Sequence, residues 1–93
     1  MSSVQEGYEE LILREDKVIL QITTSEWAVS ILMDDLLYRQ RGNACEETIK
    51  GICERIQEQE TRLRGELFAI RWEKTRLACE FPNVKKQAEV NDT

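Results

Sequence analysis

The sequence predicts an all-α fold, a long antiparallel hairpin of two helices that form a single domain over residues 1–81. Three observations lead to this fold. Apolar residues recur at helical spacing in both halves of the chain, the halves meet at Gly42-Asn43, and the sole proline, Pro82, follows the second half. With 93 residues, the chain is long enough for one small domain. Two helices of nearly equal length joined by a short connection are expected to pack antiparallel.

The second half carries the more regular pattern. It predicts one helix from about Ala44 to Glu80, roughly 55 Å long at 1.5 Å per residue. Asn43 followed by Glu46 has the form of a capping box at the start of this helix. Pro82 ends the helix, because the residue before a proline disfavours α geometry. A large aliphatic residue occupies every seventh position on one face: Ile49, Ile56, Leu63, Ile70 and Leu77.

The first half shows a matching pattern, with apolar residues at alternating steps of three and four. Gly42 suits a left-handed C′ position at its end. Two alternatives stay open. Thr23-Thr24-Ser25-Glu26 also has the form of a capping box, so a break near Thr23–Ser25 would fold the chain into a three-helix monomer. Residues 11–22 hold two short apolar runs that also fit a β-hairpin. The helical stripe consists of Val4, Tyr8, Leu11, Val18, Ile22, Val29, Leu32 and Leu36.

A turn at Gly42-Asn43 sets the register between the two helices. It places Ile22 opposite Leu63 and Val18 opposite Leu67. The polar gap that Ser25 makes in the first stripe then meets polar residues of the second helix, which supports this register. Residues 82–93 have little apolar content, so they are expected to form a flexible C-terminal tail. The residues expected to hold the hairpin are Val18, Ile22, Val29, Leu32, Ile49, Ile56, Leu63 and Ile70.

Composition argues against an enzyme and against a cofactor or metal site. The chain has no histidine, which excludes Ser-His and Cys-His nucleophile pairs. Its three cysteines, Cys45, Cys53 and Cys79, contain no CxxC pair and are too few for the usual zinc site. We expect them to be small buried apolar side chains in a reducing, intracellular compartment, either cytoplasmic or nuclear. No secretory signal and no uncharged run of membrane-spanning length are visible.

The net charge of −5 argues against nucleic-acid binding, which needs clustered bases. The second half is nevertheless close to neutral, and its bases gather late, so a nucleic-acid accessory role is kept as a distant alternative. The acid excess of the first half supports a different alternative. Under this alternative, the chain is a small acidic regulator, a chaperone or an inhibitor, that binds and masks a target protein.

The apolar content exceeds what one hairpin can bury, because one partner helix covers only one stripe. This surplus predicts a non-enzymatic protein–protein interaction module. We expect a small subunit of a larger coiled-coil or scaffold assembly, in which hairpins pack into a helical bundle as a homodimer or a hetero-oligomer. The residues predicted to contact the partner are Leu13, Leu20, Trp27, Ile31, Phe68 and Trp72.

Overall fold

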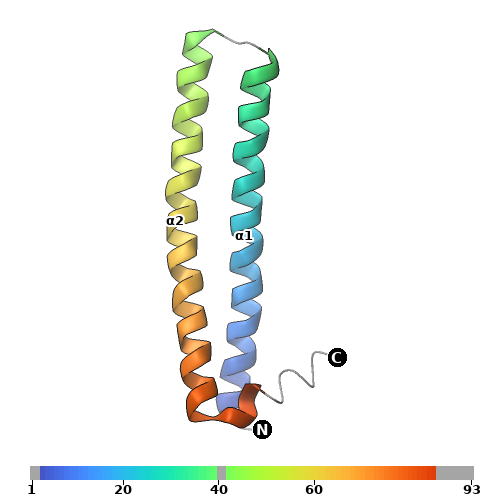
Figure 1. Ribbon diagram of the computed structural model, residues 1–93, viewed down its shortest axis with the longest axis vertical. Coiled ribbons are helices and arrows are strands. Elements are labelled where there is room, and N and C mark those ends of the chain that lie inside the picture. The colour runs from blue at the N-terminus through green and yellow to red at the C-terminus, as the bar shows by residue number, and fades with distance from the viewer. Residues whose placement is uncertain (1–2, 40–41, 86–93) are drawn as a thin grey trace.

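The chain folds as two long antiparallel helices. A computed structural model describes residues 3–39 and 42–85. Helix α1 spans Ser3–Arg39 and α2 spans Asn43–Glu80, and the two lie side by side with the start of α1 next to the end of α2 (Figure 1). The molecule is a rod of 60 × 24 × 16 Å. The predicted helical hairpin is confirmed. The β-hairpin alternative for residues 11–22 is wrong, because these residues are helical throughout.

Helix α1 continues without a break through Thr23–Ser25. Each of the three hydroxyls donates a hydrogen bond to the backbone carbonyl four residues earlier, over distances of 2.8 to 3.0 Å. A hydroxyl engaged in this way satisfies itself inside the helix and does not cap a new one. The alternative of a break here, and with it the three-helix monomer, is therefore wrong.

The turn between the helices differs in detail from the prediction. Gly42 has φ −64° and ψ 174°, which is extended backbone and not the left-handed C′ geometry expected. It occupies the N-cap position of α2, and its carbonyl accepts hydrogen bonds from the N–H groups of Cys45 and Glu46 at 3.0 and 3.1 Å. The capping box had placed the N-cap at Asn43. The observed N-cap, Gly42, lies one residue earlier. At the other end, α2 stops before Pro82 as predicted.

The core occupies the half of the rod that is remote from the turn. The ion pairs that join the helices there agree with the predicted register, since Glu15 of α1 binds Lys74 and Arg71 of α2. The long side chains of Lys74 and Arg71 cover the flanks of the core. The buried cluster is Leu11, Val18, Ile22, Leu63, Leu67 and Ile70, with Leu77 packed against it.

Burial near the turn is less complete than the sequence suggested. Val29, Leu32, Ile49 and Ile56 were predicted to hold the hairpin, but they are only half-buried. A two-helix rod has no third element to close over such a stripe, so each helix covers the other along one side alone.

The segment after α2 folds back onto the start of α1. Residues 82–85 make one helical turn, and Val84 is 5% exposed. Val4 and Gln5 of α1 line a hollow together with Val84. The packed part of the chain thus extends past residue 81, where the sequence had placed its boundary. Residues 86–93, most of the predicted tail, lie outside the described part.

Candidate interaction surfaces

All six residues predicted to contact a partner lie at the surface. Their exposed fractions run from 44% for Ile31 to 70% for Leu13, and both tryptophans, Trp27 and Trp72, exceed 60%. Large apolar side chains at this level of exposure are not part of the hairpin core. Their role in partner contact stays a prediction.

The apolar residues of α1 point away from α2 because of their spacing. Leu13 and Leu20 each follow a buried core residue, Leu11 or Val18, by two positions. Two positions turn an α-helix by about 200°, which is nearly opposite. Successive exposed apolar residues of α1 are seven, seven and four positions apart, so they lie on the same side of the helix. They form one surface, the outer stripe of α1, made of Leu13, Leu20, Trp27 and Ile31.

The other two predicted residues form a separate surface on α2. Phe68 and Trp72 stand two positions before and after Ile70, the most buried residue of the core cluster, so they face away from α1. Their rings stack with centroids 6.3 Å apart and planes inclined by 22°. The structure therefore divides the six residues between the outer stripe of α1 and this aromatic pair of α2, on opposite sides of the hairpin.

Further exposed apolar residues lie close to the turn. Met33, Leu37 and Tyr38 of α1 are 53%, 66% and 78% exposed, and Ile52 of α2 is 41% exposed. Tyr38 was missed by the sequence reasoning, although it follows Ile31 by seven positions and so prolongs the outer stripe. This seven-residue step was the signal that would have found it.

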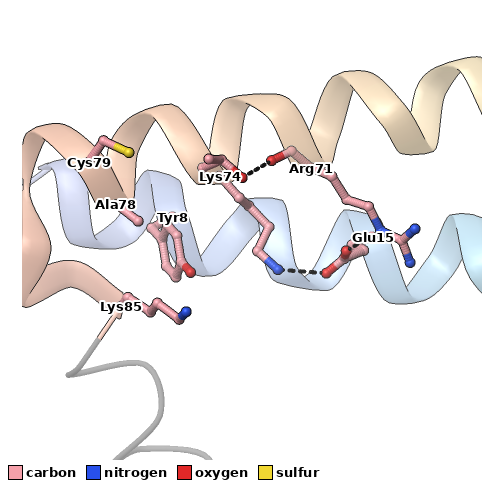
Figure 2. A pocket seen from close by; sticks show the side chains of 8 residues that line it. Tyr8, Glu15, Arg71, Lys74, Ala78, Cys79 and Lys85 are labelled. Atoms are coloured by element: carbon pink, nitrogen blue, oxygen red, sulfur yellow. Dashed lines mark hydrogen bonds and ion pairs between the residues drawn. The ribbon is translucent and has the colours of Figure 1, made fainter.

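A polar hollow of about 490 Å³ lies between the helices near the start of α1 (Figure 2). At its centre, the Glu15 carboxylate accepts hydrogen bonds from Lys74 Nζ at 2.7 Å and from Arg71 Nε at 2.9 Å. Lys74 Nζ also lies 5.9 Å from the centroid of the Tyr8 ring, within the range of a cation–π contact. The hollow is lined by Tyr8, Glu15, Arg71, Lys74, Thr75, Ala78, Cys79 and Lys85.

The hollow holds one carboxylate, Glu15, and three basic side chains, of which Arg71 and Lys74 bind that carboxylate. Burial by itself would raise the pKa of the Glu15 carboxyl, but the hydrogen bonds from Lys74 and Arg71 outweigh it and hold that pKa below its usual range. Glu15 is therefore ionised at neutral pH and occupied by two cations of the same chain. The described residues contain no group of three metal-ligating side chains. The arrangement joins α1 to α2 through the Glu15 carboxylate.

The three cysteines differ in their surroundings. Cys53 is buried, as expected of a small apolar side chain, whereas Cys45 and Cys79 are exposed, so the expectation is wrong for these two. Cys79 is exposed at the hollow between the helices, which it lines together with Tyr8 of α1. Cys45 lies in the first turn of α2.

Comparison with protein-family models, with curated proteins and with solved structures finds no match to this chain. The class that the structure itself defines is a two-helix antiparallel hairpin with two apolar outer surfaces. No helix within the described residues is both long and apolar enough to cross a membrane.

Proposed function

We propose that this chain is a non-enzymatic protein–protein interaction module, a small helical subunit of a larger coiled-coil or scaffold assembly. The observation that carries the proposal is the outer stripe of α1. It presents Leu13, Leu20, Trp27 and Ile31 in line, on the side of the helix that faces away from the core.

Physical chemistry favours covering this surface. Burying one large apolar side chain stabilises a complex by about 1.5–3 kcal/mol relative to leaving it in water. Tryptophan is also enriched among the side chains that dominate binding energies at interfaces. A partner helix laid along the stripe would add burial that the two-helix rod lacks, and would convert a hairpin with a small core into part of a bundle.

The test replaces two residues of the stripe by polar ones, Leu20→Gln with Trp27→Gln. A matched control is Arg14→Gln, which changes an exposed residue of the same helix that lies about 100° around the helix from the stripe. We expect complexes isolated from cells to contain a partner protein that the double variant loses and the control keeps, and light scattering of these complexes to give a molar mass above that of the hairpin alone. The proposal would be contradicted if the parent chain, the double variant and the control all gave the same complexes.

The acidic-regulator alternative has one specific observation in its favour, the carboxylates on the surface of α1. It differs from the first proposal in its salt dependence. Binding by apolar burial weakens only mildly as salt is added, whereas charge-driven masking of a basic target weakens steeply. The nucleic-acid alternative has less support, because Arg64, Arg71 and Arg76 each pair with carboxylates of this chain.

A further inference from the structure

We propose that the outer stripe of α1 binds a basic amphipathic helix of another protein. This inference rests on the proposed function and specifies the chemistry of the partner. Such a helix would present apolar residues at steps of three and four to the stripe, with Lys and Arg along the edge where Asp16 and Asp34 lie.

The charge at the edges of the stripe is the first argument. Asp16 lies three positions after Leu13, and Asp34 three positions after Ile31, so both border the stripe on the helix surface. Both are exposed and form no ion pair with the described residues. The charged residues along these edges are the acids Glu6, Glu9, Asp16, Asp34 and Asp35, against the base Lys17, and Asp35 pairs with Arg39 at 2.8 Å.

The hairpin itself shows what complements such a surface. On its inner side, α1 carries an apolar stripe bordered by Glu15 and Glu26. Helix α2 packs against this side with its own apolar stripe and with basic residues beside the acids of α1. Lys74 and Arg71 bind Glu15, and Arg64 binds Glu26 at 2.6 Å. The outer side of α1 repeats the apolar stripe with one acidic edge, at Asp16 and Asp34, so its complement is a second helix of the same chemistry as the inner side of α2.

A second copy of this chain fits the outer stripe poorly. Two outer stripes in parallel would bring Asp16 to Asp16 and Asp34 to Asp34. In the antiparallel arrangement centred on the stripe, Asp34 and Asp35 approach Glu9 instead. Like charges opposed across an interface oppose association. The aromatic pair of α2 offers no free bases either, since Arg64, Arg71 and Arg76 beside it already bind carboxylates.

The stripe also sets the length of the partner. From Leu13 to Ile31 it extends about 27 Å along the helix, at 1.5 Å per residue. Including Tyr38, the apolar surface reaches about 38 Å. A partner helix of about 18 to 25 residues would cover this length.

The experiment uses the full chain with Trp72→Phe, so that Trp27 is the fluorescent reporter of the stripe. The probes are two synthetic helical peptides of about 25 residues with the same leucine heptads. One carries Lys and Arg at the flanking positions, and the other carries Glu. We expect the basic peptide to bind at least about tenfold more tightly, a difference of about 1.4 kcal/mol, and to shift the Trp27 emission. Added salt should reduce this preference.

A pair of charge reversals locates the effect. Asp16→Lys with Asp34→Lys should lower the affinity for the basic peptide about tenfold and raise the affinity for the acidic one. The matched control is Glu47→Lys with Glu58→Lys, two exposed acids of α2, which makes the same change in net charge. The control should leave binding within about a factor of two of the parent.

The inference would be overturned by equal binding of both peptides, and also by a basic peptide that does not bind. Equal effects of the two double reversals would show attraction to net charge alone, and would also refute the site. The proposed function fails separately. If complexes are lost in Leu20→Gln with Trp27→Gln but the basic peptide does not bind, the interaction module stands and its partner has different chemistry.

Discussion

At the scale of single residues, a shift of two positions along a helix decides between the core and the surface. Leu11 and Leu13 are the same residue type, yet one belongs to the buried cluster and the other is 70% exposed. Ile70 and Trp72 show the same contrast on α2. The step of two positions could be read from the sequence, and for this reason all six predicted surface residues are exposed.

Substitutions at Ile70 and Trp72 should therefore have opposite consequences. Ile70 is 3% exposed, so Ile70→Ala should lower the free energy of unfolding by about 2–4 kcal/mol through the cavity it leaves. Trp72→Ala removes an exposed ring and should change stability by less than about 0.5 kcal/mol. Circular dichroism melts measure both, and light scattering follows association. Trp72→Ala should weaken assembly more than folding, and a large loss of stability in this variant would show that its ring belongs to the core.

Glu15 gives the hairpin a pH dependence. A carboxyl whose pKa is lowered by folding contributes stability above its unfolded value of 4.5, and loses that contribution as the pH falls through the folded value. Because Arg71 is largely exposed, we expect Glu15→Gln to cost no more than about 1 kcal/mol at pH 7. Urea unfolding should show that the difference from the parent disappears well below pH 4.5. Glu58→Gln, an exposed control, should show little difference at either pH. A difference that persists in acid would contradict the ion-pair account.

At the scale of elements, the hydroxyl residues in the middle of α1 are the most informative segment. The same four letters, Thr23 to Glu26, fit a capping box, and only the direction of the hydroxyl hydrogen bonds shows that α1 continues through them. A hydroxyl that bonds backward to a carbonyl and one that caps an N–H have the same sequence signature. The outcome depends on whether α2 lies beside α1 along its whole length, which is a tertiary property.

Alanine substitutions distinguish the two roles. Thr24→Ala lies on an exposed side of the continuous helix, so it should be neutral or should stabilise the protein by up to about 0.5 kcal/mol, through the better helix propensity of alanine. Loss of an N-cap would instead destabilise by about 1 kcal/mol. Thermal unfolding followed by circular dichroism measures the difference. Thr61→Ala on α2, where the hydroxyl also bonds to the carbonyl four residues earlier, is the matched control.

At the scale of the whole molecule, packing is uneven along the rod. The buried cluster and the inter-helix ion pairs of Glu15 lie away from the turn, whereas Val29, Leu32 and Ile49 nearer the turn are half-buried. Val84 closes the far end by returning to the start of α1. The end remote from the turn therefore holds most of the tertiary stabilisation.

Hydrogen exchange should follow this gradient. Amides around Ile22 and Leu63 should exchange most slowly, and those around Leu36 and Ile49 should exchange faster, because local opening needs less free energy where fewer apolar contacts are broken. Val84→Ala should speed exchange at the start of α1 more than near the turn. Mass spectrometry of the exchanging protein resolves both regions. Uniform protection along the rod would contradict the uneven core.

The two helices, the place of their connection and the outward position of the six apolar residues could be predicted from the sequence. Each of these follows from local periodicity, from Pro82, or from the fixed rotation of about 100° per residue in an α-helix. The other features depend on tertiary contacts. The continuity of α1 at Thr23–Ser25, the N-cap role of Gly42 and the burial of Val84 all depend on which segments lie side by side. The rotation of α1 against α2 about their axes also places the outer stripe and the aromatic pair on opposite sides of the hairpin.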